Sequence, residues 1–424
     1  MRLALVFILL VAVPVEARTI SDSAGRKVDV PEKIEKVFAA GPPASILLYI
    51  LAPEKMTGWP NPPTPEERPY IAPQYRDLPA LGRLTGRGGT ANLEVVLKAK
   101  PDLILDFGSV RDTYVSLADN VQDQTKIPYV LIYGRFEATP AALRLLGDIL
   151  GLKERGEHLA IYVEATFAEI DKALVEVPVD KLPLVYLARG PDGLETGVVG
   201  SINTEIIERA GGRNVAEAAG QRGLVRASIE QVIVADPEII ITWDRNFFDR
   251  VGKDPLWAGI RAVRESRIYL APTAPFGWID RPPSLNRVIG LKWLAGLFYP
   301  DRFTADFRAT TKAFYRLFYH VDPSDPELDL LVTWSKGQAP VPAATQTLNA
   351  PGGDGARLVP PILAAARRRQ ATCAPDYRGG PESGRRQLAT FQRPQLCAAS
   401  SGWQAGSWRR RARTPSQLAR GWRE

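Results

Sequence analysis

Two stretches decide the fold of this chain: NLEVVLKAKPDLIL at residues 92–105 and SIEQVIVADPEIII at residues 228–241. Aligned on their first residues, they are identical at five of fourteen positions, namely Glu94/Glu230, Val96/Val232, Ala99/Ala235, Pro101/Pro237 and Ile104/Ile240. Each copy begins with a helix-capping residue and ends in an apolar run typical of a buried strand. The chain therefore contains one βα unit twice. This predicts two similar lobes with a cleft between them, a usual place for a small ligand.

The regions around both copies alternate strands and helices, which predicts α/β lobes, each with a mainly parallel sheet flanked by helices. One amphipathic helix at Glu154–Val177 is long enough to join the lobes, and Pro178 stops it. We expect an N-terminal lobe at 18–152, a linking helix at 153–178 and a C-terminal lobe at 179–336. The expected sheet strands are Lys36–Ala40, Asp102–Asp106, Tyr129–Tyr133, Leu184–Ala188, Ile239–Trp243 and Ile268–Ala271.

Composition excludes several classes of protein. The chain has 424 residues, of which 45% are hydrophobic and 24% charged. No apolar run beyond the N-terminus reaches the roughly 18 residues that span a bilayer, so a multi-pass membrane protein is excluded. The whole chain has two His and two Cys, which rules out dense His/Cys metal sites and zinc ribbons. We expect neither His158 nor His320 to bind a metal.

Residues 1–17, MRLALVFILLVAVPVEA, have the pattern of an export signal. A positive Arg2 precedes an eleven-residue apolar run, and Val15-Glu16-Ala17 is a small-x-small cleavage site. The alternative is a buried N-terminal helix. No cysteine follows the cleavage site, so we expect cleavage after Ala17, no lipid anchor and a periplasmic location.

Residues 337–424 differ in composition from the rest. They hold fourteen Arg, no Lys and four acidic residues, a balance of +10, so residues 1–336 carry −3 of the net +7. Low hydrophobicity with one dominant charge predicts disorder. Our main interpretation is out-of-frame translation or a fusion. The alternatives are a disordered linker and an arm that binds nucleic acid or membrane. We expect the tail to be dispensable for folding and the protein to bind no nucleic acid.

Taken together, these features resemble the ABC-transporter periplasmic binding proteins that capture ferric siderophores, haem, cobalamin and some oxyanions. The resemblance covers roughly residues 19–330 and rests on the repeat, on DSAGRKVDVPEKIEKVFAAGPP at 22–43, and on DPLWAGIRAVRESRIYLAPTAPFGWIDRPPSLNRVIGLKWLAGLFYP at 254–300. It implies two lobes joined by one rigid helix, with the ligand between them. It also implies that Glu94 and Glu230 dock onto arginines of a permease dimer. The alternative for both glutamates is simple helix capping.

Ligand contacts are expected just after predicted strands, where the open ends of parallel sheets face the cleft. Arg side chains and flat aromatics suit a ferric chelate or an oxyanion. For each Arg the alternative is a solvated surface charge, and for Trp278 it is core packing. Arg87, Arg135 and Asp280 are neighbouring candidates. The predicted ligand-binding residues are Arg83, Arg111, Tyr133, Arg189, Trp243, Arg245, Trp278 and Arg281.

The sequence thus predicts a monomeric periplasmic substrate-binding component of an ABC importer, with no catalytic residues and no cofactor. The expected ligand is a ferric siderophore or a similar iron chelate. The same fold binding molybdate or tungstate, a corrinoid or a nickel chelate is the alternative. An exported sensor or an enzyme is more remote, because GxSxG, P-loop and strand-flanked GxGxxG motifs are absent.

Overall fold

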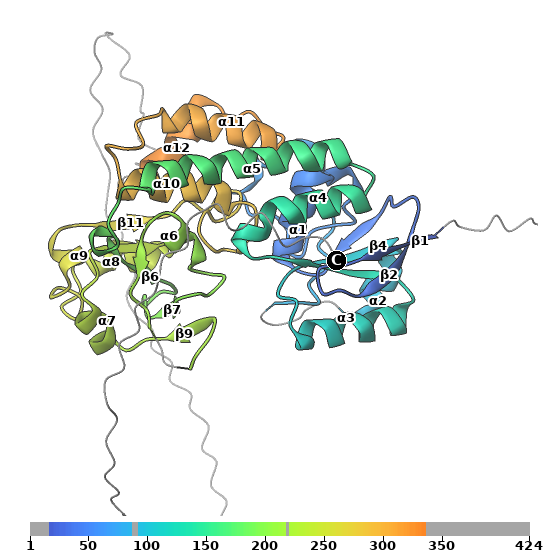
Figure 1. The fold of residues 1–424 in the computed structure, drawn as a ribbon, viewed down its shortest axis with the longest axis horizontal. Helices are drawn as coiled ribbons and strands as arrows, with labels where there is room; N and C mark the ends of the chain where they lie inside the picture. Colours follow the sequence, from blue (N-terminus) through green and yellow to red (C-terminus); the bar gives the residue numbers. More distant parts are fainter. Residues whose placement is uncertain (1–16, 87–91, 218–219, 336–424) are drawn as a thin grey trace, which may run out of the picture. The chain divides into compact units, whose positions relative to one another are not determined.

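The computed structural model describes residues 17–86, 92–217 and 220–335, and side chains up to Leu331. The expectations for the export signal, except Ala17, and for residues 337–424 lie outside these residues. Within them, the chain forms two α/β lobes, each with its own parallel sheet (Figure 1). None of the helices in the described part of the chain is long and apolar enough to cross a membrane.

The N-terminal lobe is built on a three-stranded parallel sheet in the order β3–β4–β5. A hairpin of β1 (Ala17–Ser21) and β2 (Lys27–Pro31) adds to it through the Ser23 amide, which donates to the Leu131 carbonyl. The sheet strands are β3 (Val37–Ala39), β4 (Leu103–Gly108) and β5 (Tyr129–Tyr133). The helices of this lobe are α1 (Pro42–Leu51), α2 (Leu93–Ala99), α3 (Asp112–Thr125) and α4 (Thr139–Ile149).

The C-terminal lobe has a four-stranded parallel sheet in the order β11–β10–β6–β8 and a separate antiparallel pair, β7–β9. The strands are β6 (Leu184–Ala188), β7 (Glu195–Gly197), β8 (Arg213–Asn214), β9 (Leu224–Arg226), β10 (Ile239–Thr242) and β11 (Ile268–Leu270). The helices are α6 (Glu205–Arg209), α7 (Ile229–Ala235), α8 (Arg245–Val251), α9 (Arg261–Arg264) and α10 (Arg287–Phe298).

Helix α5 (Lys153–Leu174) is the predicted linking helix, and it packs against α4 in one lobe and α10 in the other (Figure 1). Its buried residues recur every three or four positions, from Leu159 through Val163 and Phe167 to Ile170. Short 3-10 turns lie at Pro53–Lys55, Arg68–Tyr70, Pro73–Tyr75, Phe136–Ala138 and Val179–Lys181.

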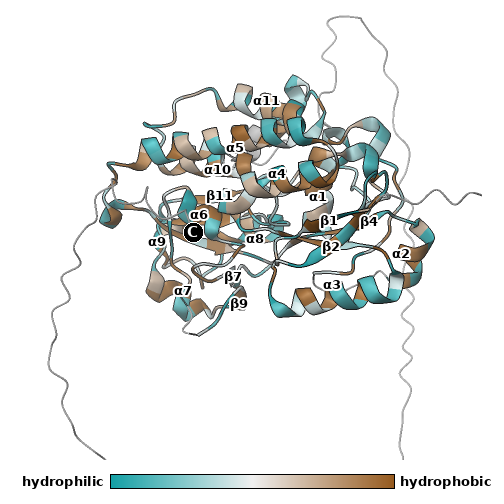
Figure 2. Cartoon of the chain, turned by 45° about the vertical axis from the view of Figure 1, so that its right-hand side comes forward, coloured by the Kyte–Doolittle hydropathy of each residue, from teal (hydrophilic) through white to brown (hydrophobic). Residues whose placement is uncertain are grey.

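The last two helices bridge the lobes. Helix α11 (Phe307–Tyr319) contacts α1 and α10, and α12 (Asp325–Ser335) contacts β11. The buried Tyr49 hydroxyl donates to the Tyr319 carbonyl at 2.6 Å, and the Tyr70 hydroxyl donates to the Glu327 carbonyl at 2.9 Å. One continuous hydrophobic core therefore runs through both lobes, and Figure 2 shows hydrophobic residues gathered on the strands and inward helix faces.

The two copies of the repeat have the same local structure in different sheets. Helices α2 and α7 have seven residues each, and each ends at a left-handed residue, Lys100 or Asp236. Each is followed by an inner strand of its sheet, β4 or β10. The prediction that the repeat builds two equivalent βα units is confirmed.

Candidate functional site

A cleft between the lobes consists of two adjoining cavities of about 670 and 690 Å³. Pro43, Gly86, Tyr114, Asn203 and Pro283 line both cavities, so the two spaces meet. The N-terminal lobe contributes the ends of β4 and β5, the first turn of α1 and the proline-rich segment 59–71. The C-terminal lobe contributes segments 200–203, 222–224 and 275–283. Parallel sheets place such loops at the carboxyl ends of their strands, so the fold itself assembles this lining.

The charged lining of the cleft is dominated by arginine. Among the described residues, Arg111, Arg222 and Arg281 line the cleft without an ion pair to a carboxylate. Arg111 contacts the Ser109 hydroxyl at 3.2 Å, and the Arg281 guanidinium lies 4.9 Å from the centre of the Trp243 ring. These guanidinium groups keep donors for an anionic ligand.

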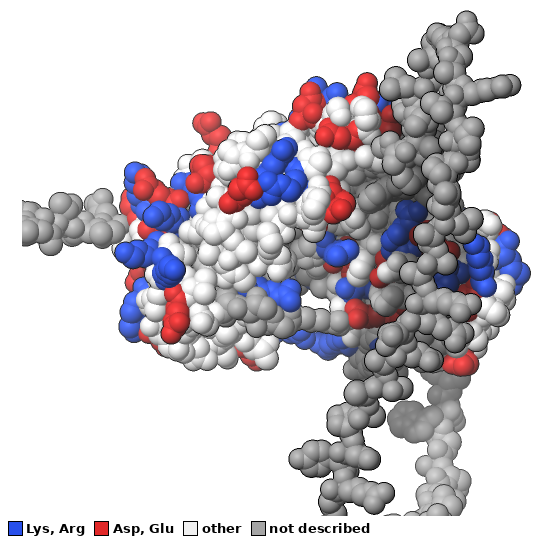
Figure 3. Space-filling model, turned by 180° about the vertical axis from the view of Figure 1, so that it is seen from behind, with Lys and Arg blue, Asp and Glu red and all other residues white. Residues whose placement is uncertain are grey.

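This positive charge is local to the cleft. Figure 3 shows acidic and basic side chains interspersed over the face that it draws. Residues 1–336 together are slightly acidic. Because arginines outnumber carboxylates in the lining, the cleft favours a ligand of negative charge.

A buried ion network ties the two lobes together beside the cleft. Arg287 is fully buried, pairs with Glu205 at 2.6 Å and donates to the Gly134 carbonyl at 2.9 Å. Glu205 also pairs with Arg135 at 2.6 Å and accepts from the Phe136 amide at 2.8 Å. Because this network joins the end of β5 to α6 and α10, it fixes the position of one lobe relative to the other.

Asp106 is a buried acid on the wall of the first cavity, within β4. It accepts hydrogen bonds from the Phe107 amide at 2.9 Å, the Thr85 hydroxyl at 3.2 Å and the Tyr129 hydroxyl at 3.3 Å. Burial raises the pKa of Asp106 to about 6, although the three hydrogen bonds oppose this rise. The group therefore titrates within one to two pH units of neutrality.

Asp280 is the buried acid of the second cavity, and it has a cation beside it. It pairs with Arg189 at 3.1 Å, and it accepts from Asn203 at 3.0 Å and from the Trp243 indole at 2.8 Å. Burial still raises the pKa of Asp280, and the Arg189 charge opposes that rise. Arg189 also pairs with Glu195 at 3.0 Å. The Arg189 guanidinium therefore already pairs with two carboxylates.

The structure places the predicted ligand-binding residues in three environments. Arg83, Arg111, Tyr133, Arg189 and Arg281 line the cleft, as does the neighbouring candidate Arg135. Trp243 lies behind the wall, where it contacts Arg281 and Asp280, and does not line either cavity. Arg245 pairs with Asp249 at 2.9 Å on α8 and lines neither cavity. Arg87 lies outside the described residues.

The expectation that Trp278 lines the cleft is wrong. Its side chain is fully buried, packs edge-on against Trp293 and Phe307, and donates to the Tyr315 hydroxyl at 3.3 Å. The surrounding loop bends around the backbone of the core helix α10, so the aromatic ring turns inward while its neighbours Asp280 and Arg281 turn to the cleft.

Sequence reasoning missed several residues at the cleft: Tyr114, Arg222, Asp106, Glu205 and Arg287. Asp106 carried a detectable signal, because an acid inside the apolar run LILDF must be buried with partners. Arg287 in the apolar stretch LNRVIGL carried the same kind of signal. Arg222 and Glu205 lie in ordinary polar surroundings that give no such signal.

The two repeat glutamates are exposed in the first turns of α2 and α7. Both helices lie on the lower side of Figure 1, away from α5 and α11. Helix capping is carried by Asn92 and Ser228, which accept from the Val95 and Gln231 amides. The Ser228 side chain holds the pKa of Glu230 below its usual value. Leu97 and Ile233, one turn after each glutamate, are 48% and 45% exposed.

Neither histidine takes part in the cleft. His320 ends α11 and contacts the Tyr49 carbonyl at 3.1 Å, while burial and Arg155 lower its pKa. Within the described part of the chain, no group of three or more His, Cys, Asp or Glu side chains could hold a metal ion.

The fold and its interlobe cleft define a periplasmic binding protein of the two-lobe type, and comparison with known proteins agrees. The chain belongs to the periplasmic binding protein family, whose sequence model matches residues 46–275. It is the binding component of an ABC importer, and members of this family bind substrates rather than transform them. Such proteins work with a membrane permease and ATPase complex.

Three similar proteins show the extent of the match. The structure of an ABC transporter solute binding protein from Sulfurospirillum deleyianum is 30% identical with a TM-score of 0.68, covering 74% of this chain and 98% of that one. The molybdate-binding protein MolA of Haemophilus influenzae is 26% identical over 335 residues, 71% of this chain and 91% of MolA. An uncharacterized ABC transporter substrate-binding lipoprotein of Bacillus subtilis, YvrC, is 22% identical over 67% of this chain and 86% of YvrC.

Proposed function

We propose that this binding protein captures an anionic metal complex of the ferric siderophore type and delivers it to an inner-membrane permease. The observation that carries this proposal is the set of cleft arginines Arg111, Arg222 and Arg281, which form no ion pair with a carboxylate among the described residues, although the charge of Arg281 acts on Glu67 in the same cavity. Guanidinium groups donate in a plane and match the oxygen atoms of an anionic chelate.

The size of the cleft supports a chelate. Each of its two cavities, at about 670 and 690 Å³, falls within the range of roughly 300–1,000 Å³ that holds drug-sized ligands. The arginines are distributed over both cavities, Arg111 and Arg222 in the first and Arg281 in the second. A ligand that contacts all three must reach from one cavity into the other. The ferric complex is cargo here, and no resident cofactor is proposed.

Molybdate is the second candidate. It is favoured by the name of the relative MolA, which is called a molybdate-binding protein. Arginine donors suit an oxyanion as well as a chelate. A small oxyanion would use the donors of one cavity only, so the two candidates differ in which arginines they need.

Calorimetric titration of the purified protein tests both candidates. The panel contains a ferric catecholate, a ferric hydroxamate, haem, cobalamin, molybdate, tungstate and nickel–histidine. For a chelate, Arg111→Ala, Arg222→Ala and Arg281→Ala should each weaken binding by roughly tenfold, the loss of one charge-assisted contact. Arg245→Ala is the matched control, because Arg245 lines neither cavity.

The outcomes separate the two candidates. Binding of a ferric chelate that depends on both cavities supports the proposal. Binding of molybdate alone, with loss in the variants of a single cavity, replaces it with the second candidate. A protein that binds no member of the panel contradicts both.

We also propose that Glu94 and Glu230 dock the protein onto the permease. Both are exposed at equivalent positions of the repeat, and each has an exposed aliphatic side chain one turn later, Leu97 or Ile233. Residues three apart share one helix face, so each lobe presents the same small surface. Exposed ion pairs contribute only about 0.2–1 kcal/mol each, so their main role would be orientation and register.

Uptake by cells that carry the importer tests docking separately from ligand capture. Glu94→Lys with Glu230→Lys should reduce uptake while the purified variant binds its ligand with unchanged affinity. Glu176→Lys, an exposed charge reversal just after α5, is the control. Unchanged uptake in the double variant would rule out docking through these residues and favour an exported sensor.

Export and oligomeric state complete the proposal. Residues 1–17 direct the chain to the periplasm and are removed after Ala17, with no lipid attached, and the mature protein is a monomer. Mass spectrometry of the mature protein gives its first residue and any lipid. Light scattering gives its mass in solution.

A further inference from the structure

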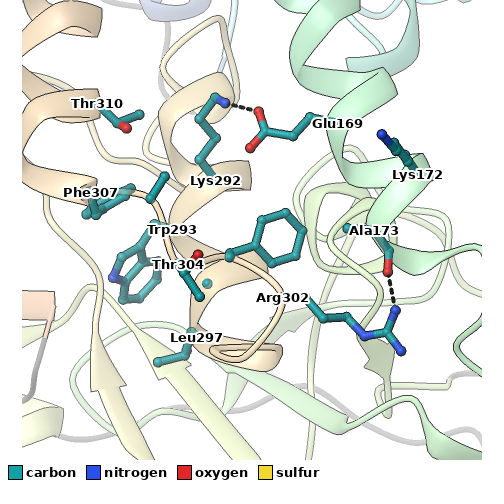
Figure 4. A pocket seen from close by; sticks show the side chains of 13 residues that line it. Glu169, Lys172, Ala173, Lys292, Trp293, Leu297, Arg302, Thr304, Phe307 and Thr310 are labelled. Atoms are coloured by element: carbon teal, nitrogen blue, oxygen red, sulfur yellow. Dashed lines mark hydrogen bonds and ion pairs between the residues drawn. The ribbon is translucent and has the colours of Figure 1, made fainter.

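A third cavity lies away from the interlobe cleft, between the end of α5, the helix α10 and the segment that leads into α11 (Figure 4). Its volume is about 640 Å³, slightly less than that of either cavity of the cleft. None of its lining residues lines the cleft. It is therefore a separate space.

The walls of this groove are apolar and aromatic. Trp293 and Leu297 come from α10, and Phe303 and Phe307 come from the segment that follows it. Gly296 also lines the groove, and a Cβ placed on it would meet no atom closer than 4.0 Å. The missing side chain leaves open space between the aromatic rings, where an alkyl chain would fit.

The rim of the groove is basic. Lys172, Lys292 and Arg302 line it with one acid, Glu169, which pairs with Lys292. Figure 4 shows this pair bridging the facing helices. Arg302 donates to the Ala173 carbonyl at 2.7 Å, and neither it nor Lys172 has an ion pair among the described residues. An apolar pocket with a doubly positive rim matches a molecule with an apolar body and one anionic end.

From these observations, we propose that the groove is a second binding site, for an amphipathic carboxylate such as a medium-chain fatty acid. The alkyl chain packs on Trp293, Leu297 and Phe307 over Gly296. The carboxylate lies between Lys172 and Arg302, whose ammonium and guanidinium groups donate to it. This site is distinct from the one that captures the transported solute, and it does not depend on the identity of that solute.

The groove also has a physical connection to the cleft. Trp293 and Phe307 both contact the buried Trp278, at ring-centre distances of 6.4 and 5.7 Å. Trp278 belongs to the same loop as Asp280 and Arg281, which line the cleft. A ligand in the groove would therefore contact Trp293 and Phe307, which pack against the loop that carries Trp278.

Titration calorimetry with dodecanoate, below its micelle concentration, tests the proposal on the purified protein. We expect saturable binding of one molecule per chain. Gly296→Leu fills the groove and should weaken binding by roughly tenfold or more, while Gly296→Ala should retain it. Lys172→Glu, an exposed change that cannot disturb the core, should weaken binding by a similar factor through charge repulsion. Arg245→Ala, on α8 and lining neither the groove nor the cleft, should leave the dodecanoate affinity unchanged.

Dodecyltrimethylammonium provides the charge control, because it has the same chain length and the opposite charge. It should bind at least several-fold more weakly than dodecanoate to the wild-type protein. Equal affinity for dodecanoate and dodecyltrimethylammonium would show that the groove binds any apolar chain regardless of charge, and it would overturn the proposal. The absence of saturable dodecanoate binding would also overturn it, as would unchanged affinity in Lys172→Glu. A thermal melt of Gly296→Leu confirms that its loss of binding is not a loss of fold.

Discussion

The two lobes each bury one carboxylate at the cleft, and they do so in opposite ways. In the N-terminal lobe, Asp106 is surrounded by neutral donors, the hydroxyls of Thr85 and Tyr129 and the Phe107 amide. In the C-terminal lobe, Asp280 has Arg189 beside it at 3.1 Å, together with Asn203 and the Trp243 indole.

This difference lies in the charge beside each buried acid. Neutral hydrogen bonds only partly offset the cost of burying a carboxylate, so the pKa of Asp106 rises to about 6. Burial also raises the pKa of Asp280, and there the charge of Arg189 opposes the rise. The two lobes therefore share a βα unit but differ in the electrostatics of their cleft walls.

The largest effect should come from removing the cation. Arg189→Leu leaves Asp280 buried without a charge partner, so we expect a loss of about 3–5 kcal/mol in the free energy of unfolding. Chemical denaturation measures this loss. The double variant Arg189→Leu/Asp280→Asn should recover much of it, because the unpaired charge is gone. Arg245→Leu, which breaks an exposed pair, should cost at most about 1 kcal/mol. Equal losses for Arg189→Leu and Arg245→Leu would show that Asp280 does not need its cation.

The next effect is the pH dependence of the unpaired acid. Because the pKa of Asp106 is raised in the folded protein, the folded state binds more protons than the unfolded state between about pH 4 and pH 6. The stabilisation is therefore complete below the unfolded pKa and is lost as pH rises through 6. It amounts to about 3 kcal/mol.

Denaturation of the wild type and of Asp106→Asn at several pH values isolates this contribution. The wild type should lose stability relative to the variant between pH 4 and pH 7, and above pH 7 the difference should be constant. A difference that does not vary with pH would mean that Asp106 does not titrate in this range.

The smallest effect concerns the helix caps of the repeat. Asn92→Ala and Ser228→Ala should each cost about 1 kcal/mol of stability, because each removes the acceptor for a first-turn amide. Ser228→Ala should cost slightly more, because the Ser228 side chain also hydrogen-bonds the Glu230 side chain. Gln231→Met removes the other half of the capping box, in which the Gln231 side chain accepts from the Ser228 amide. Chemical denaturation of the three variants checks the order, and an inverted order would contradict it.

Hydrophobic periodicity predicted the framework of both lobes. The strands Tyr129–Tyr133 and Leu184–Ala188 have the predicted bounds, because each is a short apolar run between clear stop signals. The pair β7–β9 was missed, since its strands have three residues each and join segments 27 positions apart. Helix α8 was missed although Asp244 caps it.

The cleft could be predicted only in part. The rule that loops after strands face the cleft predicted its lining residues Arg111, Tyr133, Arg189 and Arg281. It works because the sheet determines where those loops lie. Which way a side chain turns within a loop depends on packing that is not local. Trp278 shows this, since its environment is made by Trp293, Phe307 and Tyr315, residues that follow it by 15 to 37 positions.

The return of α11 to the first lobe has a consequence for biosynthesis. Tyr49 bonds to Tyr319 through its hydroxyl and to His320 through its carbonyl, and both partners are synthesised some 270 residues after it. The first lobe therefore cannot complete its interior until α11 has been synthesised. Its sheet strands come early in the chain, but the burial of Tyr49 must wait for a segment that follows the second sheet.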